Sequence, residues 1–582
     1  MLDGLVMVRL RTLLPELHAA RKAMAARRHN KAREHVFWRH FAPFSGHSPL
    51  PDCVAASLLA AFLLATFTCS CLSSGVTVIT HGYNSDVNGW VTGMADAIPA
   101  YPTFPGTNVT TYKVTLTTDG NGNYFYQVSR TNGVAPFVSK SGEIIVKLDW
   151  SQMAGGTGTY DLSTYDVAWA ASWVLLQTNT IAELNGHALA ELPIHLVGHS
   201  RGGSLVAEIS RLLGTNGVWI DHLTTLDPHP LNNDGNTDPF FPTDASANHI
   251  YANVLFGDNY WQNLASGFFD PTGEAVSGAY NRQLTTLPGG YNNTSSVSPY
   301  HSNVHLWYHG TASLTTPTSD TEASISSSER QTWWTGYEEQ GTNAGFEYSL
   351  IGRGNRLSTD QPVGPGFPAI RDGNNQWWDL GAGTSSNRTP LSSNSGQWPN
   401  IIKFNLAGTN VVTAGTAVAT KFYYQYGGAF SNIAYQIYLD PDSNPYNSNA
   451  TSVLQGSLTN TGTGSVYAMN ANLDASAVAP GTYKMYAAIS DGAHTRYLYA
   501  PDPVQIILGR QAPILDIAGS LSTKFRIGIT GIPGETVVLQ SSISLQSWLP
   551  VATNTLTSGR WVYTNASPAS GSALFYRAVL SP

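Results

Sequence analysis

The sequence predicts an α/β domain with a mostly parallel sheet, followed by two all-β modules. Between residues 75 and 345, short apolar runs alternate with segments of helical spacing, which is the pattern of a sheet flanked by helices. After residue 400, short strands of alternating apolar and polar residues are separated by regular turns, which indicates β-sandwich modules. At 582 residues the chain is long enough for several domains.

We interpret residues 1–74 as a basic leader and signal peptide. The first 70 residues carry nine lysines and arginines against four acidic residues, and Val54–Thr68 is an uncharged, mostly apolar run of 15 residues. A run of this length suits the hydrophobic region of a signal peptide and is short for a membrane span. We therefore expect a secreted or cell-surface protein, with a membrane anchor as the alternative.

Charge and cysteine content narrow the function classes. Beyond residue 70 the chain has 34 acidic against 21 basic residues, so it would repel a phosphate backbone, and nucleic-acid binding is disfavoured. The three cysteines, Cys53, Cys69 and Cys71, lie in or beside the leader, so we expect neither disulfides nor thiolate metal sites in the rest. No pattern with zinc-ligand spacing stands out, and we expect no metal and no cofactor.

Apolar runs and glycine breaks predict the elements of the α/β domain at residues 75–345. Short buried strands end at polar or small residues, and helices are expected to end at a glycine cap. The expected strands are Val76–Thr80, Ile144–Leu148, Ile194–Val197, Ile220–Leu226 and His249–Phe256. One expected helix runs from Leu162 to Asn185, before Gly186, and a second follows Gly202 and ends at Gly214.

The third strand runs into Gly198-His199-Ser200-Arg201-Gly202, and a helix follows. A G-x-S-x-G sequence between a strand and a helix is typical of a nucleophile elbow, in which glycine neighbours accommodate a serine on a strained turn. The alternative is an ordinary Gly/Ser turn before a helix. We expect Ser200 to be a catalytic nucleophile.

A serine nucleophile needs a base, and the base needs an acid that orients it. Asp227 follows the strand Ile220–Leu226, and Asp258 follows the next expected strand, so both are candidate acids. His301 and His305 are candidate bases. The chain order serine, acid, histidine is the order of α/β-hydrolases.

Five short motifs in one order resemble the pancreatic-lipase-type family of lipases and phospholipases, over about residues 75–315. They are His81-Gly82-Tyr83, Leu148-Asp149-Trp150, Ile194–Ser200, Leu226-Asp227-Pro228 and the segment from His301 to Tyr308. The resemblance implies Ser200 as nucleophile, Asp227 as acid and His301 as base. It favours these over Asp258 and His305, which remain the alternatives.

The same resemblance implies an oxyanion hole made by the backbone N–H groups of Tyr83 and Arg201. Because only the backbone acts there, we expect side-chain changes at these two positions to be tolerated. It assigns no catalytic role to His81 or His199, while His229, His305 and His309 are expected to pack or to line the cleft. Affinity for an oil surface is not implied, because the C-terminal part differs from that of the family.

Residues from about Tyr101 to Ser141 form an insertion after the first strand. Alternating residues on both sides of a turn predict a β-hairpin. The paired residues are Tyr112, Val114 and Leu116 against Tyr124, Tyr126 and Val128, across Asp119-Gly120-Asn121-Gly122. The hairpin either covers the active site or is a surface elaboration.

The C-terminal part is expected to contain three regions. A capping box at Ser326 and Glu329 predicts a helix that carries Trp333, Trp334 and Tyr337, before an extension or linker at residues 346–400. A β-sandwich is expected at 401–510, and a small β-module like those of exported bacterial proteins at 511–582. Asp440–Asn444 either binds calcium or is an acidic turn, and aromatic residues of the last module either form its core or contact a polysaccharide or a cell surface.

These observations predict a secreted serine ester hydrolase, lipase-like or carboxylesterase-like, that acts on a small-molecule or lipid ester through an acyl-enzyme. The alternative is a catalytically inactive protein of the same fold that serves in surface binding or adhesion. Preference for an ester over an amide or a polyester, and the length of the acyl chain, do not follow from the sequence.

Overall fold

The computed structural model describes the chain from Ser74 to Ser581 with internal gaps. The described residues are 74–101, 109–232, 241–264, 271–287, 290–291, 299–315, 317–333, 345–351, 388–407, 410–414, 417–463, 465–475, 478–507, 512–521, 524–565 and 574–581. The expected signal peptide, the three cysteines, Trp334, Tyr337 and most of the region 346–400 lie outside them. Among the described helices, none combines the length and the apolar character needed to cross a membrane.

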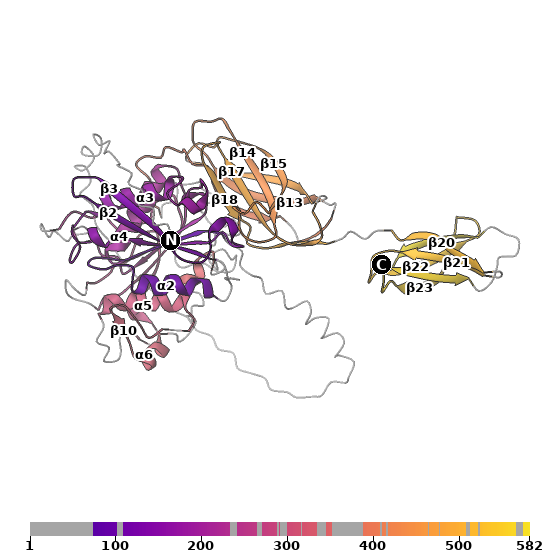
Figure 1. Ribbon diagram of the computed structural model, residues 1–582, viewed down its shortest axis with the longest axis horizontal. Coiled ribbons are helices and arrows are strands. Elements are labelled where there is room, and N and C mark those ends of the chain that lie inside the picture. The colour runs from indigo at the N-terminus through magenta and orange to yellow at the C-terminus, as the bar shows by residue number, and fades with distance from the viewer. Residues whose placement is uncertain are drawn as a thin grey trace, which may run out of the picture. The chain divides into compact units, whose positions relative to one another are not determined.

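The N-terminal domain contains an eight-stranded sheet with the order β3-β2-β4-β1-β5-β6-β7-β8 (Figure 1). Neighbouring strands are parallel throughout, except that β3 is antiparallel to β2. The strands are β1 Val76–Thr80, β2 Thr110–Thr118, β3 Tyr124–Asn132, β4 Ile144–Asp149, β5 Ile194–His199, β6 Ile220–Leu226, β7 Val254–Trp261 and β8 Tyr280–Gln283. The predicted fold class, a mostly parallel α/β sheet followed by all-β sheets, is confirmed.

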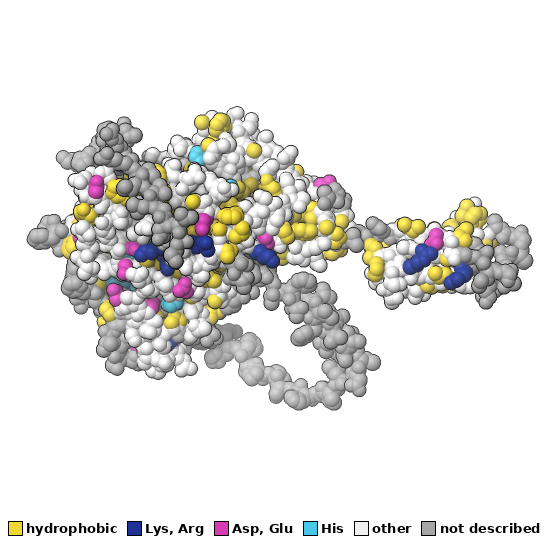
Figure 2. All heavy atoms as spheres, viewed as in Figure 1, with side chains coloured by type: hydrophobic (Ala, Val, Ile, Leu, Met, Phe, Trp, Pro, Cys, Tyr) yellow, Lys and Arg dark blue, Asp and Glu magenta, His cyan; other side chains and the backbone are white. Residues whose placement is uncertain are grey.

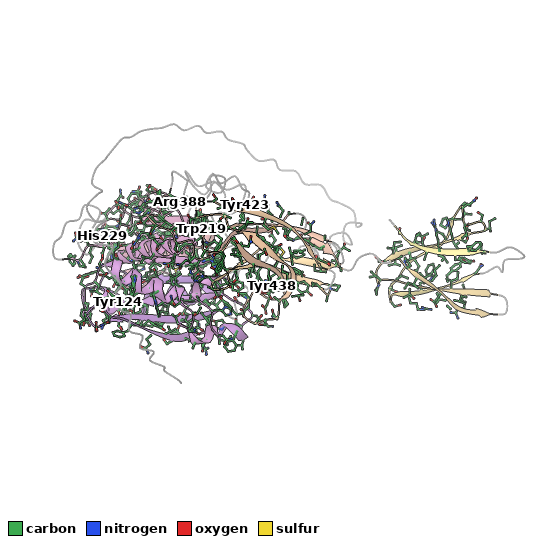
Figure 3. The ribbon with its side chains drawn as sticks, turned by 90° about the horizontal axis from the view of Figure 1, so that it is seen from above. Tyr124, Trp219, His229, Arg388, Tyr423 and Tyr438 are labelled. Atoms are coloured by element: carbon green, nitrogen blue, oxygen red, sulfur yellow. The ribbon has the colours of Figure 1, made fainter. Side chains whose placement is uncertain are left out.

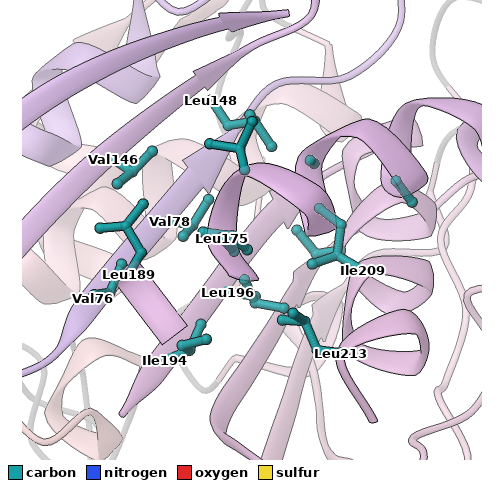
Figure 4. Close-up of a cluster of buried hydrophobic side chains, with 14 of the residues drawn as sticks. Val76, Val78, Val146, Leu148, Leu175, Leu189, Ile194, Leu196, Ile209 and Leu213 are labelled. Atoms are coloured by element: carbon teal, nitrogen blue, oxygen red, sulfur yellow. The ribbon is translucent and has the colours of Figure 1, made fainter. Parts of the chain in front are cut away.

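Helices cover both faces of this sheet, because its buried strands are apolar on both sides. One face packs against α3 (Thr164–Leu176) and α4 (Arg201–Thr215), in a cluster that includes Val78, Leu196 and Ile209 (Figure 4). The other face packs against α2 (Trp90–Ala97) and α5 (Tyr300–Ala312). The short helix α6 (Ser327–Thr332) and the two-residue strands β9 (Ser319–Asp320) and β10 (Ala323–Ser324) lie nearby in the sequence.

Two predicted elements have bounds that differ from the structure by five residues or more. The helix expected to reach Asn185 ends at Leu176, where the Thr180 hydroxyl donates hydrogen bonds to the carbonyls of Val174 and Gln177. The strand expected at His249–Phe256 instead covers Val254–Trp261. The chain turns before it, because the Asn253 side chain donates to the carbonyls of Ser210 and Val218. The second difference moves Asp258 from the end of a strand into its interior.

The predicted hairpin is present, but it continues the central sheet. Val114 pairs with Val128 and Leu116 with Tyr126, as the alternating pattern predicts. Strand β2 also pairs in parallel with β4, so the two strands form one edge of the sheet (Figure 1). The described part of the insertion therefore extends the sheet, and whether its turn covers the active site stays a prediction.

The described β part begins with two sheets. One has the order β11-β13-β16, and the other has the order β12-β19-β17-β14-β15 with β18 paired to β17. Their strands are β11 Asn400–Leu406, β12 Val411–Thr413, β13 Ala417–Gln425, β14 Asn432–Asp440, β15 Thr451–Thr459, β16 Tyr467–Asp474, β17 Gly481–Ser490, β18 Thr495–Tyr499 and β19 Val504–Ile507.

The α/β domain and most of this sandwich belong to one compact unit. The buried Arg496 side chain on β18 donates to the carbonyls of Ala190 and Trp219, at 2.7 and 3.1 Å. Trp219 also packs against Ile402 and Tyr423 of the sandwich (Figure 3). Buried carbonyls need hydrogen-bond donors, and here the donor for two carbonyls of the α/β domain is the Arg496 side chain of the sandwich.

The acidic segment Asp440–Asn444 forms a turn that is satisfied by protein donors. The Asp440 carboxylate accepts the backbone N–H groups of Asp442 and Asn444, and the Asp442 carboxylate accepts the Asn447 and Asn449 side-chain amides. Nowhere in the described ranges do three or more His, Cys, Asp or Glu side chains gather in a way that could hold a metal ion. Because protein N–H groups already occupy these carboxylate oxygens, the geometry favours an acidic turn over a calcium site at Asp440–Asn444.

The last described strands form the sheets β20-β21-β24 and β23-β22-β25. They are β20 Ile514–Leu521, β21 Lys524–Thr530, β22 Thr536–Ser542, β23 Leu549–Thr555, β24 Arg560–Asn565 and β25 Phe575–Leu580. Trp561, Tyr563 and Tyr576 are partly buried and pack against a small core of buried residues, whereas Phe575 is exposed. Other apolar side chains, among them Ile543 and Leu549, are exposed (Figure 2).

Candidate active site

Ser200 lies on a strained turn between β5 and α4. Its φ of 59° and ψ of −127° belong to a region that residues other than glycine rarely adopt, at a cost of about 1–3 kcal/mol. The neighbouring glycines are needed because backbones approach here: a Cβ at Gly198 would lie 2.1 Å from the Gly202 carbonyl oxygen, and one at Gly202 would lie 2.5 Å from the His81 oxygen. This is the geometry that the G-x-S-x-G motif predicts.

The loop after β1 passes directly over the serine. A Cβ at Gly82 would lie 2.7 Å from the Ser200 Cβ and 3.1 Å from its Oγ. Tyr83 follows Gly82, and Arg201 is the first residue of α4 after Ser200. Gly82 and Ser200 are therefore in contact, and the two backbone amides expected to form the oxyanion hole belong to the residues that follow them in the chain.

His81 and Trp150 hold this loop in place. The Trp150 side chain donates to the His81 carbonyl at 3.1 Å, and the Trp150 backbone N–H donates to His81 Nε2 at 3.2 Å. Because Nε2 accepts, Nδ1 is assigned the hydrogen, which it donates to the Gly82 carbonyl at 3.0 Å. The rings also stack, with centroids 5.5 Å apart. The family resemblance assigns His81 no catalytic role, and its contacts are those of a support for the loop after β1.

Asp227 and His301 form a buried pair at the carboxyl end of the sheet. Asp227 follows β6 with a φ of 44°, and its backbone N–H donates to the Tyr260 carbonyl at 2.7 Å. Its Oδ2 accepts from His301 Nδ1 at 2.6 Å. Since an ionised carboxylate only accepts, the hydrogen lies on Nδ1, and Nε2 is the nitrogen that can take a further proton.

Gln262 completes the environment of Asp227. Its backbone N–H donates to Oδ1 and its side chain to Oδ2, both at 2.9 Å. Burial raises the pKa of the Asp227 carboxyl, while the hydrogen bonds from His301 and Gln262 oppose that rise. A Cβ at Gly273 would lie 2.0 Å from Oδ1, so that position requires glycine. Gln262 and Gly273 belong to no motif, so sequence reasoning missed both.

Backbone hydrogen bonds join the serine turn to the aspartate turn. The Ser200 N–H donates to the Leu226 carbonyl at 2.9 Å, and the His229 N–H donates to the Ser200 carbonyl at 3.1 Å. These two hydrogen bonds hold the turns together at the ends of the adjacent strands β5 and β6.

His229 is neutral at pH 7, because burial and the repulsion from His301 lower its pKa to about 4.

The alternative acid and base have other partners. Asp258 lies within β7, opposite Thr224, and its carboxylate accepts from His222 Nε2, the Thr224 hydroxyl and the Tyr260 hydroxyl at 2.9, 2.6 and 2.9 Å. His305 lies one turn beyond His301, and its Nδ1 contacts Asp320 Oδ2 at 3.2 Å. The structure thus pairs Asp227 with His301, and it places Asp258 and His305 in different contacts.

The Arg201 side chain has a structural role, so the expectation that changes there are tolerated is contradicted. It is fully buried and forms a two-pronged ion pair with Asp244, at 2.8 and 2.9 Å. It also donates to Asp161 at 2.7 Å and to the carbonyls of Ala154 and Leu162. Loss of a buried cation leaves its carboxylate partner uncompensated, which costs about 3–5 kcal/mol.

Comparisons with known proteins identify no family. No protein-family model and no curated protein matches the chain. Among solved structures, a CARDB domain from Pyrococcus furiosus, in complex with di-metal ions, is 11% identical, with a TM-score of 0.14 over 19% of this chain and 96% of that domain. Apo β-glucuronidase 3 of Bacteroides uniformis is 10% identical, with a TM-score of 0.10 over 31% of this chain and 23% of that enzyme. The chain is therefore characterised by its α/β-hydrolase-like sheet topology and the all-β sheets that follow.

Proposed function

We propose that this protein is a secreted serine ester hydrolase of the pancreatic-lipase type. The observation that carries the proposal is the buried Asp227–His301 pair, which lies next to the strained turn that presents Ser200. The Asp227 turn is joined to the Ser200 turn by backbone hydrogen bonds. A strained serine, an oriented imidazole and a buried carboxylate are the parts that acyl transfer requires.

In the proposed mechanism His301 Nε2 removes the proton from Ser200 Oγ as the oxygen attacks an ester carbonyl. Asp227 holds the ring in the correct tautomer and stabilises the imidazolium that forms. The amides of Tyr83 and Arg201 stabilise the oxyanion, and loss of one such donor costs on the order of 10²- to 10³-fold in rate. The imidazolium then protonates the leaving alcohol, and water, activated by the same imidazole, releases the acid.

The substrate class that we propose is a small-molecule or lipid ester. Contact of the C-terminal β-module with a cell surface or a polysaccharide is a separate proposal, for which the exposed apolar side chains of that module are the available support. Export rests on the sequence of the leader alone.

The test is hydrolysis of p-nitrophenyl acetate together with labelling by a fluorophosphonate probe, which reacts with activated serines. Ser200→Ala should lower kcat by about 10⁴-fold or more and abolish labelling. Ser210→Ala is a matched control, because Ser210 is a buried serine of α4, the helix that follows Ser200, and its hydroxyl donates to the Ala207 carbonyl. Labelling that survives in Ser200→Ala would overturn the assignment. A wild-type chain that neither hydrolyses the ester nor reacts with the probe would support the inactive, surface-binding alternative.

A further inference from the structure

His199 precedes the proposed nucleophile in the chain and contacts the backbone of the proposed base. It is the last residue of β5, directly before Ser200, and its Nε2 lies 3.0 Å from the backbone carbonyl oxygen of His301. The centroids of the two imidazole rings are 4.5 Å apart. One side chain therefore joins the turn that holds Ser200 to the first turn of α5.

The protonation state of His199 makes this contact a hydrogen bond of defined direction. Burial, followed by repulsion from His301 and His305, lowers the pKa of His199 well below its ordinary value, so the ring is neutral at pH 7. A neutral imidazole has one N–H, and a carbonyl oxygen can only accept. The hydrogen therefore lies on Nε2 and is donated to the His301 carbonyl.

The plane of the His199 ring is set by aromatic neighbours. Trp90 and His305 stack on each other at 5.0 Å, and both meet the His199 ring nearly at right angles, at 5.9 and 4.7 Å. His305 is itself in contact with Asp320 at 3.2 Å. Contacts from α2 and α5 thus restrict the rotation of His199 about its side-chain bonds.

We propose that His199 is a positioning residue, which sets the place of the His301 imidazole relative to Ser200 through its hydrogen bond to the His301 backbone. Acyl transfer depends on this placement, because a displacement of about 1 Å can cost roughly 10²-fold in rate. The inference rests on the proposed function, because the hydrogen bond from His199 can affect catalysis only if Ser200 and His301 are the reacting groups.

The experiment compares side chains of different reach in the full chain. His199→Gln places an amide N–H about as far from the backbone as imidazole Nε2, whereas His199→Asn is one methylene too short. We expect His199→Asn, and His199→Phe, which keeps a ring without a donor, to lower kcat for p-nitrophenyl acetate by about 10- to 100-fold with little change in KM. His199→Gln should keep kcat within about fivefold of the wild-type value.

His195→Gln is the matched control. His195 is a buried histidine of the same strand that stacks on His222 and contacts the Thr224 hydroxyl, and it is expected to retain kcat. Equal kcat in His199→Asn and His199→Gln, whether both high or both low, would overturn the inference. If His199→Phe does not fold, the Asn and Gln pair decides. A wild-type chain without Ser200-dependent hydrolysis would remove the proposed function and this inference together, whereas an active chain unaffected by His199→Asn would remove the inference alone.

Discussion

Two Asp–His pairs involve the neighbouring strands β6 and β7 of the central sheet, and in one of them the histidine comes from helix α5. Asp227 contacts His301 at 2.6 Å and Asp258 contacts His222 at 2.9 Å, and both carboxylates are fully buried. They differ in their position along the strands. Asp227 follows the last residue of β6, whereas Asp258 is paired with Thr224 inside the sheet. Ligands of open α/β sheets bind beyond the carboxyl ends of the strands, so under the proposed function the first pair has the position that a substrate would reach.

Exposure shows the same difference. The His301 side chain retains 8% of its accessible surface, while the His222 side chain retains none. The Asp227 carboxylate is otherwise held by the amides of Gln262, and the Asp258 carboxylate by the hydroxyls of Thr224 and Tyr260. Identical residue types therefore form a candidate catalytic pair at the edge of the sheet and a structural pair within it.

The largest effect that we predict separates the two aspartates. Asp227→Asn should lower kcat for p-nitrophenyl acetate by about 10⁴-fold, because an amide N–H facing His301 favours the tautomer that cannot accept the serine proton. Asp258→Asn should leave kcat within about threefold of the wild-type value. Steady-state kinetics on both variants checks this, and the opposite result would make Asp258 the acid.

The contrast between Asp227 and Asp258 shows which features of the fold could be predicted from the sequence. Strands β1 and β6 match their predicted bounds, because each is a short buried run that ends at a polar residue. The nucleophile turn follows from the steric need for Gly198 and Gly202. Asp258 was misplaced because His249–Phe256 has the composition of a strand, while the actual strand begins at Val254.

Supporting residues were missed for a different physical reason. Arg201 pairs with Asp244, 43 residues away, and His199 with the carbonyl of His301, 102 residues away. Such contacts leave no local periodicity, since they arise only when distant elements pack. Strand and turn patterns therefore predict where Ser200 and Asp227 lie, and the family resemblance selects Asp227 and His301. The fold decides what surrounds them.

A third buried carboxyl, that of Glu143 directly before β4, accepts a hydrogen bond from a hydroxyl group and extends the comparison. Burial raises the pKa of Glu143, which accepts from the Thr77 hydroxyl, to about 8. Its proton is therefore retained in the folded state and lost in the unfolded state between about pH 4.5 and 8, so this group lowers the free energy of unfolding as pH rises through that window.

Glu143→Gln should remove this pH dependence. Relative to the wild-type chain, the variant should gain up to about 1.4 kcal/mol per pH unit between pH 5 and 8, since the amide carries no charge in either state. Urea unfolding followed by tryptophan fluorescence at pH 5, 6.5 and 8 measures the difference. A difference that stays constant across these three values would show that Glu143 is ionised in the folded protein.

The structural pair is predicted to matter for stability. Asp258→Asn keeps the volume of the side chain but cannot accept all three hydrogen bonds from His222, Thr224 and Tyr260. The loss should lower the free energy of unfolding by about 1–3 kcal/mol. Chemical denaturation of this variant beside Asp227→Asn tests the point, and unchanged stability would mean that the Asp258 contacts contribute nothing net.

The smallest predicted effect concerns Gln262, which distinguishes the surroundings of Asp227 from those of Asp258. Gln262→Leu removes one of three hydrogen bonds to the Asp227 carboxylate and leaves the one from its own backbone. Because the lost bond stabilises the ionised form, the pKa of Asp227 should rise, and the acid limb of the kcat profile should move to higher pH. We expect kcat at pH 7 to fall roughly three- to tenfold, since a hydrogen bond to a charged group is worth about 1.5 kcal/mol or more.

Gln283→Leu, on the neighbouring strand β8, is the control, because the Gln283 side chain contacts Thr285 and not Asp227. A profile that does not shift in Gln262→Leu would show that the Gln262 side chain does not set the protonation of Asp227.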